Sequence, residues 1–155
     1  MTLHADDRLA LSDLVHRYAA RVDDRQFDLA AELFTTDAEL LLPDPPQTLE
    51  PVHRQLGHVA ISAAIATVAS TIRTQHAIVG EVYDAGPSPD VAHGRIGCVA
   101  HHWVSREDQT RDVTWYLRYE DEYQRAAGAQ WRIRFRALTI DAIDARPIHQ
   151  VRPEA

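Results

Sequence analysis

The hydrophobic positions at the start of the chain follow the spacing of a helix. Asp6 or Asp7 can cap this helix, and the apolar residues behind them recur at helical intervals, at Leu11, Leu14, Val15, Tyr18 and Val22. The polar run 23–25 ends the stripe. The pattern therefore predicts one amphipathic helix, with Tyr18 on its apolar face and Asp23 at its end.

Further elements are predicted between residues 27 and 72. The segment 27–34 favours a short second helix, and 38–42 favours a strand. The proline-rich segment 43–56 is expected to be a long loop, which makes it the candidate for a mobile flap over a site. An alanine-rich apolar run over 60–72, free of Gly and Pro, predicts a third, buried helix.

From residue 76 onward the pattern changes to that of β-strands. Four strand-like runs are separated by segments rich in turn formers, at 76–83, 91–104, 113–124 and 130–143. Connections this short imply antiparallel hairpins. Helices followed by a meander predict a single α+β domain over 1–155, with three helices packed on a curved, mostly antiparallel sheet that encloses an apolar pocket. We expect the tail from about residue 147 to be loosely held.

His76 is the first candidate functional residue. It opens a strand after Arg73-Thr74-Gln75, and strand alternation places it on the face of the residues at 78, 80 and 82. A histidine on such a face fits either a hydrogen-bonded core position or a functional group. Tyr18 and Asp23, near the end of the first helix, favour the functional interpretation.

Aromatic residues mark one face of the strand 113–124, which we interpret both as core and as the wall of the pocket. In the preceding strand, His101 and Trp103 share one side, and His102 lies on the other. Because side chains alternate, only one of the two histidines can face the pocket unless a bulge intervenes, and which one stays open. The candidate substrate-binding residues are His101, Trp103, Trp115 and Tyr119.

Composition narrows the functional classes. The 155 residues are 45% hydrophobic and 25% charged, as in an ordinary soluble domain. The net charge of −7 and the lack of a basic stripe argue against nucleic-acid binding. Three arginines, Arg132, Arg134 and Arg136, alternate with apolar residues, so they are predicted to form the solvated face of a strand, with a phosphate site as the alternative.

The single cysteine, Cys98, excludes an internal disulfide and fits a reducing compartment. It lies in a strand-like run, where a buried small hydrophobe is favoured over a nucleophile. The N-terminus lacks the pattern of a signal peptide, and no window approaches eighteen apolar residues. These features predict a cytoplasmic protein without a membrane partner.

Four motifs together resemble the SnoaL-like proteins of the nuclear transport factor 2-like superfamily, in the branch with scytalone dehydratase, bile acid 7α-dehydratase and lindane dehydrochlorinase. The resemblance covers roughly 6–143. The motifs are Tyr18-Ala-Ala-Arg-Val-Asp23, Arg73-Thr74-Gln75-His76, Val99-Ala100-His101 and Trp131-Arg132-Ile133. The resemblance implies a cone-shaped fold, a pair between Asp23 and His76, a Tyr18 hydroxyl that completes the catalytic set, and no cofactor.

The resemblance also implies an activity. We expect a cofactor-independent lyase, preferentially a dehydratase, that acts on a hydrophobic cyclic molecule of polyketide, steroid or terpenoid type, in a homodimer. Scytalone itself is not expected, because the tyrosines of scytalone dehydratase fall at Val22 and within 40–42, and an asparagine falls near Tyr119.

The chemistry of such a pair stands on its own terms. A carboxylate that holds one ring nitrogen fixes the histidine tautomer and stabilises the imidazolium that forms when the other nitrogen removes a proton. Two histidines and an aspartate can also bind zinc, but no close-spaced motif such as HExxH is present, so no metal is expected. Isomerase, cyclase and epoxide hydrolase activities, and a non-catalytic small-molecule-binding module, remain the alternatives.

Overall fold

A computed structural model describes residues 2–126 and 128–153 of the chain. Its helical elements are α1 (Ala5–Asp23), α2 (Phe27–Ala31), α3 (Gly57–Ile65) and the 3₁₀ turn η1 (Ala66–Ser70). Its strands are β1 (Phe34–Asp44), β2 (Thr48–Leu56), β3 (Arg73–Ala85), β4 (Val91–Arg106), β5 (Gln109–Gln124) and β6 (Arg132–Pro147).

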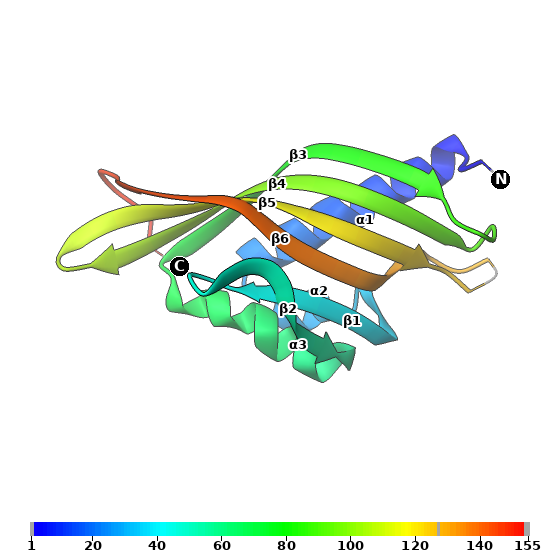
Figure 1. The fold of residues 1–155 in the computed structure, drawn as a ribbon, viewed down its shortest axis with the longest axis horizontal. Coiled ribbons are helices and arrows are strands. Elements are labelled where there is room, and N and C mark those ends of the chain that lie inside the picture. Colours follow the sequence, from blue (N-terminus) through cyan, green and yellow to red (C-terminus); the bar gives the residue numbers. More distant parts are fainter. Residues whose placement is uncertain (1, 127, 154–155) are drawn as a thin grey trace.

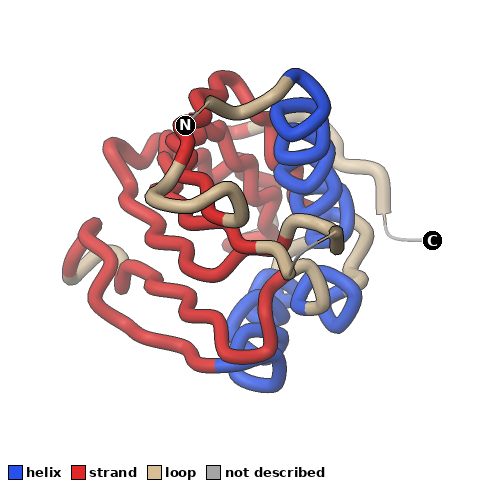
Figure 2. Tube along the Cα trace, turned by 90° about the vertical axis from the view of Figure 1, so that its right-hand side faces the viewer, coloured by secondary structure: helices blue, strands red, loops and turns tan. Residues whose placement is uncertain are grey.

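The strands form one curved sheet in the order β2-β1-β6-β5-β4-β3. Neighbouring strands are antiparallel except β1 and β6, which run parallel. Figures 1 and 2 show α1 lying along the sheet, with α2 and α3 near the end that β1 and β2 form. The predicted α+β fold, with three helices on a mostly antiparallel sheet, is confirmed.

Helix α1 is held by the apolar stripe that its sequence predicts. The buried residues of this helix are Leu11, Leu14, Val15, Tyr18, Ala19 and Val22. They pack against residues of the sheet in one core that includes Phe34 of β1, Ile96 of β4 and Ile133 of β6. The side chains that α1 directs into the molecule therefore meet the concave face of the sheet.

Three expectations for residues 27–72 are wrong. Helix α2 ends at Ala31, and Phe34 instead begins β1, where it pairs with Ile133 of β6. The segment expected to be a mobile flap forms a hairpin, because β2 pairs antiparallel with β1. Helix α3 ends at Ile65, continues as η1, and buries only a narrow stripe. An alanine-rich run has no clear hydrophobic periodicity, so the sequence could not distinguish a fully buried helix from one that packs on the sheet with a single face.

Two β-bulges change which side chains face inward. In β3 the register shifts between Ile78 and Gly80, so Val82 is 58% exposed while Tyr83 is buried. In β6, Tyr123 pairs with Ile133 and Glu122 with Phe135, so residue 134 is the extra residue of a second bulge. A bulge reverses the alternation beyond it. The predicted faces of the residues at 80 and 82, and of Arg136, are therefore wrong.

Candidate active site

Asp23 and His76 meet where the end of α1 lies against the start of β3. The Asp23 carboxylate accepts three hydrogen bonds: Oδ1 lies 2.7 Å from His76 Nδ1 and 2.8 Å from the Thr74 hydroxyl, and Oδ2 lies 2.9 Å from the His76 backbone nitrogen. The side chains of His76 and Asp23 are 9% and 22% exposed. The expected contact between them is therefore present, in a site with little access to water.

Arg25 ties the end of α1 to the segment that leads into β3. Its backbone takes a positive φ of 62° directly after the helix. Its guanidinium donates hydrogen bonds to the carbonyl oxygens of Val68 (2.5 Å), Thr71 (2.9 Å) and Ile72 (3.3 Å). These bonds fix the position of β3 relative to α1, and they thereby set the distance between Asp23 and His76.

His102, and not His101, is the second histidine of this site. The pairing of His76 with Ala100 puts the side chains of Ala100 and His102 on the face of β4 that carries His76. The His102 ring lies 6.1 Å from the His76 ring and 4.6 Å from the Trp115 ring, between centroids. His101 and Trp103 lie on the opposite face, so the structure does not bring them to the Asp23–His76 pair, and their role in substrate binding stays a prediction. Trp115 does lie beside the histidines.

Burial keeps His102 neutral. Desolvation lowers the pKa of His102 to about 4, although a hydrogen bond to the Val113 carbonyl acts in the opposite direction. Since that carbonyl can only accept, the proton lies on Nδ1, at 3.0 Å, and Nε2 keeps its lone pair. At neutral pH the site therefore offers two imidazoles of different character: His76 on a carboxylate, and His102 on a backbone carbonyl.

A buried ion pair lies deeper between the helix and the sheet. Arg136 donates from Nε and Nη2 to the two oxygens of Asp121, at 2.8 and 2.6 Å. Its guanidinium carbon lies 4.5 Å from the centre of the Tyr18 ring and 4.0 Å from that of Tyr119. Its Nη1 is buried and has no hydrogen-bond partner within residues 2–126 and 128–153. Sequence reasoning missed this cationic donor because the bulge at residue 134 carries no signal in the sequence.

Tyr18 belongs to this deeper cluster. Its ring packs edge-on against Phe34 and Tyr119, and burial raises the pKa of its hydroxyl. Among the contacts of the described residues, no hydrogen bond or ring contact joins Tyr18 to His76. Its role as the third catalytic residue stays a prediction. Cys98 is buried near Asp23 and Arg136. Burial raises the pKa of its thiol to about 12, so this side chain acts as a small hydrophobe.

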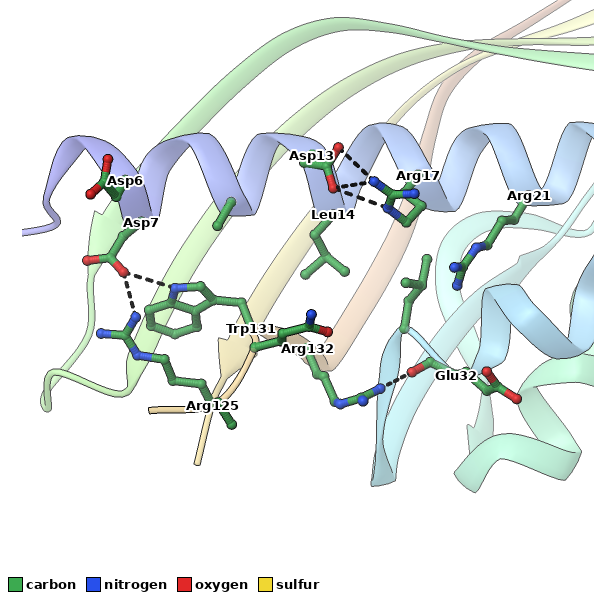
Figure 3. Close-up of a pocket in the computed structure, with 14 residues that line it drawn as sticks. Asp6, Asp7, Asp13, Leu14, Arg17, Arg21, Glu32, Arg125, Trp131 and Arg132 are labelled. Carbon is green, nitrogen blue, oxygen red and sulfur yellow. Dashed lines mark hydrogen bonds and ion pairs between the residues drawn. The ribbon is translucent and has the colours of Figure 1, made fainter. Parts of the chain in front are cut away.

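The cavity shown in Figure 3 is separate from the histidine site. It has a volume of about 640 Å³ and lies between the N-terminal half of α1 and Trp131. Several of its charged side chains already have partners, because Asp7 binds Arg125 and the Trp131 ring nitrogen, and Asp13 binds Arg17. We therefore regard it as a surface groove braced by ion pairs. His76 does not line this cavity or three others that the described residues form, so the enclosed apolar pocket stays a prediction.

Within residues 2–126 and 128–153, no group of three or more His, Cys, Asp and Glu side chains is arranged to hold a metal ion. No helix in the same ranges is long and apolar enough to cross a membrane.

The structure thus has three helices on a curved sheet, with a partly buried histidine–aspartate pair where the first helix meets it. The chain belongs to the family of SnoaL-like domains, whose model matches residues 3–137. The family expected from the sequence is confirmed. No curated protein matches the chain significantly.

Solved structures share this fold at low sequence identity. The Kfla4162 protein from Kribbella flavida superposes with a TM-score of 0.75 at 20% identity, over 90% of this chain and 93% of its own. Hexachlorocyclohexane dehydrochlorinase LinA type 2 gives 0.72 at 19% identity, over 97% and 94%. An NTF2-like protein from Novosphingobium aromaticivorans gives 0.67 at 17% identity, over 88% and 82%. These values establish the fold.

Proposed function

We propose that the chain is a cofactor-independent lyase or isomerase, and that it dehydrates a small, hydrophobic, cyclic substrate with His76 as the general base. The observation that carries this proposal is the Asp23–His76 pair, with its carboxylate held by three hydrogen bonds. A partly buried aspartate held by three hydrogen bonds can orient the imidazole and stabilise its protonated form.

The geometry assigns a role to each ring nitrogen of His76. Nδ1 carries a proton and donates a hydrogen bond to Asp23, which leaves the lone pair on Nε2 for a substrate C–H. As the proton of the substrate C–H bond moves to Nε2, the electrons of that bond form the new double bond, and the bond to the leaving hydroxyl breaks. The imidazolium then returns its proton to the hydroxyl, which leaves as water. General base catalysis of this kind contributes about 10²–10⁴-fold.

Two neighbours complete the proposed reaction. His102 is neutral, so its Nε2 can accept a hydrogen bond from the leaving hydroxyl and orient that group. Arg136 supplies the only strong N–H donor without a partner among the buried side chains described. A cationic donor of this kind stabilises negative charge that develops on a substrate carbonyl when the C–H bond breaks.

Hexachlorocyclohexane dehydrochlorinase, which shares the fold, is named for an elimination, and this supports the lyase class for the present chain. One observation favours a second candidate, epoxide hydrolysis: Asp121 and Arg136 form a buried carboxylate–guanidinium pair on neighbouring strands. That chemistry calls for a second carboxylate on Arg136, and in the described residues Nη1 has none. Elimination or isomerisation therefore remains our proposal.

The test begins with the small molecule that the purified protein retains, identified by native mass spectrometry. Incubation of that compound with the protein in D₂O, followed by NMR, measures exchange of the acidic C–H, and mass spectrometry measures loss of water. We expect both in the wild type and neither in His76→Gln. His93→Gln serves as the matched control, because His93 is exposed on β4. Equal exchange in wild type and His76→Gln would refute the proposal.

A further inference from the structure

A second histidine–aspartate pair, between β4 and β5, lies on the opposite face of the sheet. His101 Nδ1 lies 2.7 Å from Asp112 Oδ2, and the Thr114 hydroxyl donates to Asp112 Oδ1 at 2.9 Å. The pairing of β4 with β5 puts all three side chains on the face away from His76. The arrangement repeats the threonine, aspartate and histidine of the interior site, and the proposed dehydration does not use it.

This second pair is largely buried and does not lie on an open surface. The Asp112 side chain is only 3% exposed, and it also has Arg146 Nη2 at 3.5 Å. His101 keeps one edge accessible, with its side chain 22% exposed, and it stacks on Trp103 at an interplanar angle of 17°. A buried carboxylate thus holds the imidazole in a fixed orientation beside an aromatic surface.

The pair lines a cavity of about 640 Å³, which is within the size range of small-molecule sites. The described C-terminal tail forms one wall of this cavity, through Ile148, Gln150, Val151 and Arg152. Arg73 holds that wall in place, because its Nε and Nη2 donate hydrogen bonds to the carbonyl oxygens of Arg152 and Pro153 at 2.7 and 3.0 Å. The tail, expected to be loose, is tied to the start of β3 as far as residue 153.

The lining of the cavity is positively charged, whereas the chain as a whole is negatively charged. Three arginines, Arg73, Arg146 and Arg152, line it against a single carboxylate, Asp112, although the whole chain carries a net charge of −7. The Asp112 carboxylate is already occupied by His101 and Thr114. Arg152 is exposed, and its guanidinium has no partner in the described residues. The free positive charge therefore has an anion as its natural ligand.

The walls of the cavity set a second requirement for the ligand, in addition to negative charge. Trp103 offers a flat face, and Ile148 and Val151 are half-buried apolar neighbours from the tail. We propose that this cavity binds a small aromatic carboxylate, with the ring between Trp103 and the tail and the carboxylate on Arg146 and Arg152. Trp103 and Asp112 lie on the other face of the sheet from His76, although Thr74, which donates to Asp23, also lines the cavity. The inference does not rest on the proposed function.

Isothermal titration with benzoate tests the inference, and benzamide serves as the uncharged probe of the same shape. We expect one benzoate site per chain, with benzamide at least about tenfold weaker, because the arginines select the charge. Arg152→Gln and Arg146→Gln should each weaken benzoate by roughly tenfold. Arg95→Gln is the matched control, because Arg95 is an exposed arginine on β4 outside this cavity, and it should leave the affinity unchanged.

Three outcomes would overturn the inference. Equal affinity for benzoate and benzamide would show that the cavity does not recognise the negative charge. Equal affinity for benzoate and inorganic phosphate would show that it does not recognise the aromatic ring. Benzoate binding that survives both arginine substitutions but disappears in His76→Gln would place the ligand in the interior site. A thermal melt of each variant accompanies the titration. Arg152→Gln keeps the test decisive because, within residues 2–126 and 128–153, this exposed side chain has no partner to lose.

Discussion

Neutralising Asp121 should destabilise the protein more than any substitution of an exposed carboxylate. Asp121→Asn keeps the side-chain volume, so it opens no cavity, but it leaves the positive charge of Arg136 without its counter-ion. Arg136 is 0% exposed, and two of its three guanidinium nitrogens donate to Asp121. Removal of one partner of a buried ion pair costs about 3–5 kcal/mol. This is a large share of the ~5–15 kcal/mol that stabilises a typical domain.

Urea denaturation followed by far-UV circular dichroism measures the effect. With a slope of about 2 kcal/mol per M, the expected loss lowers the midpoint by roughly 2 M. The double variant Asp121→Asn/Arg136→Met removes both charges and should recover most of that loss. Asp141→Asn is the control, because its pair with Arg118 is exposed and long, at 3.7 Å, and its loss should cost less than about 1 kcal/mol. A loss below 1 kcal/mol in Asp121→Asn, or none recovered in the double variant, would refute the reasoning.

Further predictions concern the interior site and the assembly. Once the substrate is known, His76→Gln and Asp23→Asn should each abolish most turnover, and the double variant should lose little more, because the two residues act as a unit; additive losses would contradict this. Tyr18→Phe should cost about one to two orders of magnitude in kcat if its hydroxyl meets the substrate, and unchanged kinetics would exclude it. The folded pKa of His102, about 4, lies below its ordinary value of 6.5, so the unfolded chain binds more protons between these values. Stability from this residue is therefore complete above pH ~6.5, falls by about 3 kcal/mol towards pH 4, and should become less pH-dependent in urea titrations of His102→Leu. We also propose a homodimer through the outer face around Tyr116, which is 42% exposed; light scattering that returns the 17.5 kDa monomer would contradict it.

The elements with strong periodicity were predictable from the sequence. The helical stripe behind Asp7 placed α1 within a residue or two of its observed end, and turn formers separated the four long strands correctly. The juxtaposition of Asp23 with His76 was implied by the family resemblance that the motifs around them carry. The helix and the strands depend on residues near one another in the chain, where propensity and spacing act directly.

The face on which a side chain lies was decided only by the tertiary structure. Strand alternation showed that His101 and His102 point in opposite directions, but the pairing of β4 with β3 selected His102 for the interior. Arg136 was expected in solvent, and the bulge at residue 134 turns it onto Asp121. Register and bulges arise from the fit between strands distant in sequence, and a shift of one residue exchanges the two faces of a strand. The sequence therefore determined which residues this protein has for its chemistry, and the packing of the strands determined which of them meet.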